Sequence, residues 1–165
     1  MDGDLAPDLY CTHLAAESNT LYIGKNNAFL DATAPLGLGV PSMPRTGFGV
    51  VARDFNRDGR EDLLVGNGRV TRGPEVVLPS LADPWNGMAE PNDLYLRSGS
   101  GFELAPKDPV LSEVGLTRAV VAGDFDRQGQ LEVLIVNVET PSILVAPPKS
   151  DARELFVEAV DQDGH

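Results

Sequence analysis

The stretch GVVARDFNRDGREDLLVGN, residues 49–67, aligns without gaps on AVVAGDFDRQGQLEVLIVN, residues 119–137. Asp54 and Asp124 occupy the same place in the two copies, 70 residues apart. Each copy reads as a strand, an acidic loop that contains glycine, and a second strand. Such self-similarity is the signature of a repeat protein.

The rest of the chain also consists of short apolar runs between turn-forming residues, and helical periodicity is scarce. Runs of about five residues rich in Val, Leu, Ile and Tyr between such turns predict β-strands. The predicted strands are 8–12, 21–24, 48–52, 62–66, 93–97, 102–105, 119–123, 132–136, 142–146 and 154–160. Because each repeat then holds four short strands, we predict an all-β protein of four-stranded antiparallel β-propeller blades.

Two segments depart from the simple repeat. Residues 2–10 match the second half of the acidic loop and the start of its outgoing strand, so they form an imperfect third copy. Residues 70–91 hold four prolines and the single tryptophan, Trp85, between two strands. We interpret this excursion either as an ordered insertion packed by Trp85 or as a binding loop.

The loop of the first copy carries oxygen-bearing side chains at positions one, three, five and nine, and a glycine at position six where the chain turns. Calcium takes six to eight oxygen ligands, and a backbone carbonyl often fills position seven of such a loop. We therefore predict a calcium site formed by Asp54, Asn56, Asp58, the carbonyl of Arg60, and Asp62. Position twelve is valine within a strand, which excludes an EF-hand. The alternative is a polar hairpin turn whose carboxylates cap backbone N–H groups.

The other two loops depart from this pattern. In the second copy the candidate ligands are Asp124, Asp126, Gln128 and Glu132. We predict weaker binding there, because Gln128 replaces the carboxylate of Asp58 and Glu132 is longer than Asp62. The opening copy offers Asp2, Asp4 and Asp8 but has no position one, and Leu5 replaces the glycine. We expect this truncated loop to bind no metal.

Composition excludes several classes of partner. The 165 residues carry 13 basic and 25 acidic side chains, a net charge of −12, which repels nucleic acid and anionic membranes. No apolar run approaches the roughly 20 residues of a membrane span, and residues 1–10 have no features of an export signal. The single cysteine, Cys11, rules out an internal disulfide.

The sequence contains no recognisable catalytic motif. It has no Gly-x-Ser-x-Gly elbow, phosphate-binding glycine loop or His-x-x-His pair. We interpret His13 as a packing or hydrogen-bonding residue at a strand end, and Cys11 as a small core residue. The chain is therefore expected not to be an enzyme. A carbohydrate-binding or carbohydrate-processing propeller, with carboxylates at the mouth of its channel, is the alternative.

The calcium-type loops resemble the FG-GAP/VCBS repeats of integrin-α-type β-propellers, in which Phe48-Gly49 would supply the "FG". A closer resemblance is to the ASPIC/UnbV family, and it covers nearly the whole chain. The motifs that carry it are DLYCTH (8–13), ESNTLY (17–22), FLDAT (29–33), LGL (36–38), PSMPRTGFG (41–49), PNDLYLR (91–97) and the second loop.

The resemblance implies a calcium-binding module of extracellular, periplasmic or cell-surface proteins that binds other molecules without catalysis. Propellers of this family have about seven blades, so we expect a fragment of two to three. We divide the chain into two parts: propeller repeats over 1–150, and the start of a C-terminal ASPIC/UnbV-type region over 151–165. The repeats comprise a partial blade, 1–46, and two further blades, 47–105 and 117–150. Expected partners are calcium and an extracellular protein or glycan. Open blade edges would also favour self-association.

Overall fold

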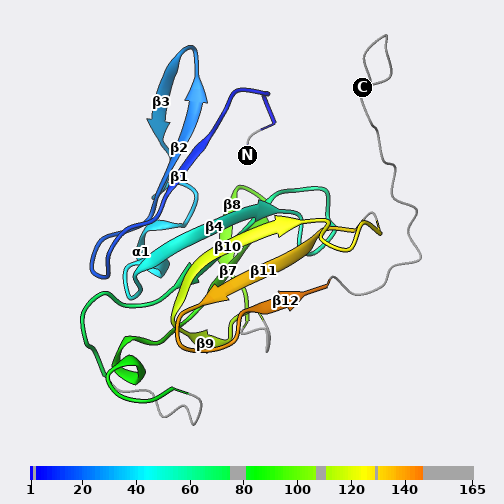
Figure 1. Ribbon diagram of the computed structural model, residues 1–165. Helices are drawn as coiled ribbons and strands as arrows, with labels where there is room; N and C mark the ends of the chain where they lie inside the picture. Colours follow the sequence, from blue (N-terminus) through cyan, green and yellow to red (C-terminus); the bar gives the residue numbers. More distant parts are fainter. Residues whose placement is uncertain (2, 75–80, 107–110, 129, 147–165) are drawn as a thin grey trace.

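The computed structural model describes residues 1, 3–74, 81–106, 111–128 and 130–146, and these residues form an all-β fold (Figure 1). The first sheet consists of β1 (Leu9–Cys11), β2 (Thr20–Lys25) and β3 (Ala28–Asp31). The central sheet has the order β4 (Gly47–Arg53), β5 (Asp62–Asn67), β7 (Asp93–Ser98) and β8 (Gly101–Leu104). The third sheet consists of β10 (Thr117–Gly123), β11 (Glu132–Asn137) and β12 (Ile143–Val145). All neighbouring strands in these sheets are antiparallel.

Smaller elements connect the sheets. The helix α1 (Gly39–Ser42) precedes β4, and a 3₁₀ helix over Trp85–Met88 leads into β6 (Glu90–Pro91). β6 pairs with β9 (Val114–Gly115), and the two form a short ladder beside the larger sheets. Among the described residues, no helix is long and apolar enough to span a membrane.

The three sheets repeat one another in register. Leu9 pairs with Tyr22 in the first sheet, as Leu63 pairs with Tyr95 in the central sheet and Val133 with Val145 in the third. A hydrogen bond from a backbone N–H to an asparagine side chain also repeats. The Oδ1 atom of Asn19 accepts the His13 N–H at 2.8 Å, and the Oδ1 atom of Asn92 accepts the Asn67 N–H at the same distance. The repeat predicted from the sequence is thus a structural repeat.

Alternating side chains of the central sheet contact a different neighbour on each face. Leu63, Val65 and Tyr95 pack with the first sheet in one buried cluster. Val51, Leu64 and Leu94 pack with the third sheet in a second cluster. Since β-strand side chains alternate between faces, β5 is buried along its whole length. The sheets are therefore stacked face to face, as blades are in a propeller.

The first strands of two sheets lie side by side, β4 next to β10 (Figure 1). Their backbones come closest at Gly49, where an added Cβ atom would lie 2.4 Å from the Val120 nitrogen and 2.9 Å from Ala119 backbone atoms. Only glycine fits such an approach without a backbone shift.

Most strands agree with the prediction, and the differences have local causes. The expected strands between 8 and 136 are present, and the one at 142–146 is observed as β12. The predicted strand 154–160 lies outside the described residues. β3 was not predicted, because its apolar run is only three residues long, Ala28 to Leu30, and ends at Asp31. The Asn26-Asn27 turn before β3, with φ of 54° and 60°, is a hairpin signal that could have identified it.

The described part of the 70–91 excursion is ordered and contributes a strand. Arg69 N–H donates to the Met88 carbonyl and Gly73 N–H to the Gly87 carbonyl, both at 2.8 Å. Trp85 is half-buried, whereas Leu81 is buried. Cys11 is also not the core residue that the sequence predicted. Tyr10 packs into the core, so Cys11 points to the opposite face of the first sheet and is half-buried.

Two buried acids hold the strand ends that lie opposite the acidic loops. Both carboxylate oxygens of Asp93 accept the Nε–H of Arg45 at 2.9 Å, and Oδ2 also accepts from the Asn67 amide at 3.0 Å. Glu90 accepts from the Thr46 N–H and from Arg69 Nε. Burial raises the pKa of Asp93, and the bond from Arg45 opposes that rise. The pairing with Arg45 therefore offsets part of the cost of burying this carboxylate.

We expect Gly49→Ala to lower the free energy of unfolding by roughly 1–3 kcal/mol, the usual cost of overpacking, because the new methyl group meets backbone of β10. Gly39→Ala is the matched control. Its Cβ would lie 3.8 Å from the nearest atom, inside α1, so stability should stay equal or rise. Urea unfolding of both variants measures the difference. Equal stability of the two would show that β4 and β10 do not approach this closely.

We expect Arg45→Met to destabilise the fold by about 3 kcal/mol at neutral pH, because Asp93 loses its cation while buried. Removing Arg45 raises the folded-state pKa of Asp93 further above the unfolded value, so protonation favours the folded state. The loss should therefore shrink as pH falls towards 4. Urea unfolding at both pH values, with Lys25→Met on the exposed end of β2 as control, tests this. A loss independent of pH would contradict it.

Candidate metal loops

The two complete acidic loops connect equivalent strands. Residues 54–61 join β4 to β5, and residues 124–131 join β10 to β11. Arg53 pairs with Asp62 across the base of the first loop, as Gly123 pairs with Glu132 across the second. The antiparallel ladders thus bring positions one and nine of each loop to the same strand end.

The side chains of the first loop fold back on its own backbone. Asp54 accepts the N–H groups of Asp58 at 3.0 Å and Gly59 at 2.8 Å. Asn56 Oδ1 also accepts the Asp58 N–H, and Asp58 Oδ1 accepts the Arg60 N–H, both at 3.0 Å. These successive turns direct the side chains of positions one, three and five inward.

Position nine is part of the protein core. Asp62 is fully buried, and its Oδ2 accepts N–H groups from Phe55 at 2.8 Å and Asn56 at 3.3 Å. Its Oδ1 accepts the Arg97 N–H of β7 at 2.7 Å. One carboxylate therefore joins the loop to two strands of the central sheet.

A basic side chain neutralises part of the first loop. Arg60 donates to Asp58 Oδ2 from Nε at 3.3 Å and from Nη2 at 3.0 Å. The side-chain bond from Arg60 lowers the pKa of Asp58. Sequence reasoning assigned Arg60 only a backbone carbonyl and missed this counter-charge. Its guanidinium would compete with a cation for the Oδ2 atom of Asp58.

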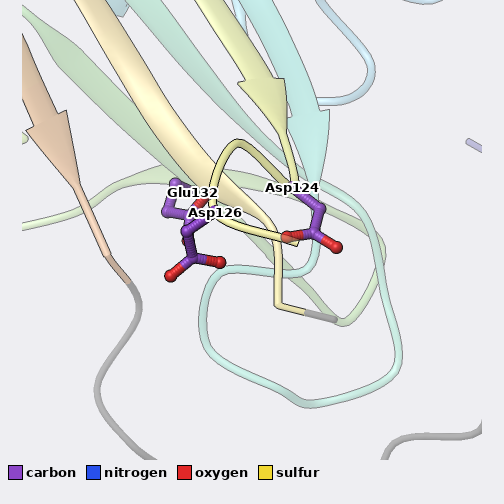
Figure 2. Close-up of side chains that lie close together, drawn as sticks. All are labelled: Asp124, Asp126 and Glu132. Carbon is purple, nitrogen blue, oxygen red and sulfur yellow. The ribbon is translucent and has the colours of Figure 1, made fainter. Parts of the chain in front are cut away.

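The second loop brings its acidic oxygens close together. Asp124, Asp126 and Glu132 each offer a carboxylate oxygen, and these oxygens all lie within 4.8 Å of one another (Figure 2). Glu132 is buried and accepts the Phe125 N–H at 2.7 Å. The backbone N–H of Gln128 donates to Asp124 at 3.0 Å and to Asp126 at 2.9 Å.

The two loops differ in how closely their acidic oxygens lie. Among the described residues, the acids of the second loop form such a group, and Asp54, Asp58 and Asp62 do not. Moreover, the proposed ligand positions of the two loops carry three carboxylates each, because Asp126 stands where the first loop has Asn56. The argument that Gln128 leaves the second loop with less charge therefore fails.

The opening copy keeps the shape of the loop. Asp4 Oδ1 accepts the Ala6 N–H at 2.8 Å, which repeats the turn at Asp58. Asp8, at position nine, accepts the Gly24 N–H of β2 at 3.0 Å and also contacts the Met1 ammonium. Asp2, the remaining candidate, lies outside the described residues.

Left-handed backbone occurs at the same loop positions in different copies. Position four has a φ of 82° at Gly3, 63° at Arg57 and 58° at Arg127. Position six has a φ of 67° at Leu5 and 84° at Gly59. Leu5 takes up this conformation although a non-glycine residue is disfavoured there by about 1–2 kcal/mol. The loop backbone is therefore set by its surroundings as well as by its glycine.

Chemically, the loops offer oxygen donors alone. Carboxylates, an amide and backbone carbonyls suit hard cations such as calcium. In the described residues His13 lies elsewhere, at the end of β1, where its ring nitrogens lie 3.5 Å from Thr20 and 3.4 Å from Glu17.

The repeated loops, the antiparallel sheets and their common register are those of a β-propeller repeat protein. Residues 1–65 match the family described as FG-GAP-like repeat. It is similar to cartilage acidic protein 1, with 30% identity to the Mus musculus protein and 29% to the Homo sapiens protein, each over 136 residues. The Xenopus tropicalis protein is 28% identical over 137 residues. These alignments cover 81% of this chain but 17–18% of the relatives, so the chain spans less than a fifth of their length.

We expect Asp62→Ala to destabilise the metal-free protein by about 3 kcal/mol or more, because three backbone N–H groups lose a buried acceptor. The exposed residue Glu113 provides the control Glu113→Ala, which should change stability by less than about 0.5 kcal/mol. Urea unfolding in the presence of a chelator measures both. If Asp62→Ala matched the control, position nine would serve metal binding alone.

Proposed function

We propose that this chain is a calcium-binding β-propeller module that serves extracellular binding or scaffolding rather than catalysis. The observation that carries the proposal is the convergence of Asp124, Asp126 and Glu132 within 4.8 Å in a loop that recurs at residues 54–62. Three carboxylates this close repel one another, and a divalent cation would relieve that repulsion.

Calcium is the cation that best fits the donors. It accepts six to eight oxygens in flexible geometry, and extracellular modules bind it with dissociation constants of about 10⁻⁴–10⁻³ M. In the first loop the proposed ligands are Asp54, Asn56, Asp58, the carbonyl of Arg60, and Asp62. In the second they are Asp124, Asp126, Gln128 and Glu132. The loops belong to folded hairpins, so binding would stabilise the fold.

An extracellular setting is supported by the match of residues 1–65 to the FG-GAP-like repeat and by the name of the relatives, which refers to cartilage. We propose an extracellular protein or glycan as the partner. The net charge of −12 disfavours nucleic acid. We also propose that residues 151–165 begin an ASPIC/UnbV-type region.

The sequence ranks the first loop above the second, and we keep that ranking. The ranking rests on position nine, because Glu132 is longer than Asp62 and changes the reach of that carboxylate to the metal. Arg60 opposes the ranking, because its guanidinium already neutralises part of the charge of Asp58. Variants of position one in each loop separate these effects.

We expect calcium at 100 times its dissociation constant to raise the free energy of unfolding by roughly 2.7 kcal/mol per site. Thermal unfolding with a chelator, with magnesium and with calcium measures this gain. Asp54→Ala and Asp124→Ala are the matched variants, each compared with its own chelator baseline. Asp54→Ala should remove the larger share.

An unchanged melting temperature on adding calcium would refute the calcium proposal. A larger loss in Asp124→Ala would overturn the ranking of the loops but not the proposal. Stabilisation by oligosaccharides, or their hydrolysis, would instead favour a carbohydrate-binding or carbohydrate-processing propeller.

A further inference from the structure

The first and third sheets each present an apolar face away from the central sheet. On the third sheet, Val121, Leu134 and Leu144 pair in register across the three strands. On the first sheet, Tyr10 and Leu21 pack towards the central sheet, so Leu9 and Tyr22 point the other way. Gly24 lies two residues after Tyr22 in β2 and therefore faces the same way. Phe29 pairs with Gly24, so Phe29 also belongs to the outward face. We call these residue sets the third-sheet face and the first-sheet face.

The third-sheet face repeats a surface that is buried elsewhere in this chain. Val121, Leu134 and Leu144 are the register equivalents of Val51, Leu64 and Leu94, which the third sheet covers. Val51 and Leu94 are each 8% exposed, whereas Val121 is 45% and Leu144 is 55% exposed.

The first-sheet face repeats the other surface that takes part in a contact between two sheets of this chain. Leu9 and Phe29 are the register equivalents of Leu63 and Phe102. Leu63 and Phe102 share one buried cluster with Leu21 of the first sheet and with Leu36 and Leu38, which follow that sheet in the chain. Leu63 and Phe102 are 0% and 4% exposed, whereas Leu9 and Phe29 are 47% and 55% exposed.

The two faces are therefore of the two types that pack against each other between neighbouring sheets within the chain. In both internal contacts, a face of the third-sheet type packs against a face of the first-sheet type. We propose that a second copy of this chain stacks head to tail, its first-sheet face on the third-sheet face of the first copy. The contact is heterologous, and it continues the internal stacking across the two molecules.

Charge sets the conditions for this association. Each copy carries a net charge of −12, so long-range repulsion opposes the contact at low salt. Salt screens the repulsion and leaves the apolar contact, so association should strengthen as ionic strength rises. A contact dominated by surface ion pairs would weaken instead.

Sedimentation velocity of the full chain over a wide concentration range tests the proposal. With high salt, the mass should rise from 17.6 kDa to at least twice that value as concentration increases. Phe29→Asp and Leu144→Asp each remove one face and should be monomeric alone. An equimolar mixture should form a dimer and nothing larger, because each variant retains the face that the other lacks.

Val40→Asp is the control, because Val40 is 79% exposed on α1 and belongs to neither face. It should associate like the unmodified chain. Far-ultraviolet circular dichroism checks that the aspartate variants fold, and Phe29→Ser and Leu144→Ser replace them if they do not. Cys11 gives a readout without any substitution. It is half-buried on the first-sheet face, so its rate of alkylation should fall as concentration rises.

Several results would overturn the proposal. The proposal would be wrong if the chain stayed monomeric at every protein and salt concentration. That result is expected if the residues after 146 cover the third-sheet face. Association of Phe29→Asp alone would indicate contact between two third-sheet faces, and loss of association in Val40→Asp would indicate a different surface. Alkylation of Cys11 that does not change with concentration would exclude the first-sheet face.

Discussion

The fold depends on one strand being buried on both faces. Leu63 and Val65 of β5 point towards the first sheet, and Leu64 points towards the third. A slip of one residue would send each of these side chains to the wrong neighbour, so both clusters would lose their packing together. The register of β5 therefore sets the stacking of all three sheets, and the polar ends of the strand, Asp62 and Asn67, fix that register through buried hydrogen bonds.

The candidate metal loop is tied to the same strand. Asp62 is the first residue of β5, and its carboxylate connects the loop backbone at Phe55 with β7 at Arg97. Asp8 makes the equivalent bond to Gly24 of β2. Any cation that pulls on position nine therefore acts on the strand pairing of its sheet, which couples ion binding to the stability of the core.

The sequence predicted what depends on local pattern. The repeat of residues 49–67, the strand periods and the acidic spacing led to the all-β repeat fold and to the loops. It could not reveal Arg60 turning onto Asp58 or the close group of Asp124, Asp126 and Glu132, because side-chain direction depends on tertiary surroundings. The paired acids Glu90 and Asp93 were missed because their partners, Arg69 and Arg45, are distant in sequence. β6 and β9 were missed because a two-residue ladder has no period of its own.

The opening copy separates the shape of the loop from its charge. Leu5 adopts the left-handed backbone of Gly59, and Asp4 repeats the turn of Asp58, although a leucine replaces the glycine of position six. The strand ends and side-chain caps that are present in this copy are therefore enough to form the second half of the loop. If shape comes without the complete ligand set, then cation affinity must depend on how many carboxylates reach the centre and on what already neutralises them. In the opening copy the Met1 ammonium contacts position nine, in the first loop Arg60 contacts position five, and in the second loop three acids converge.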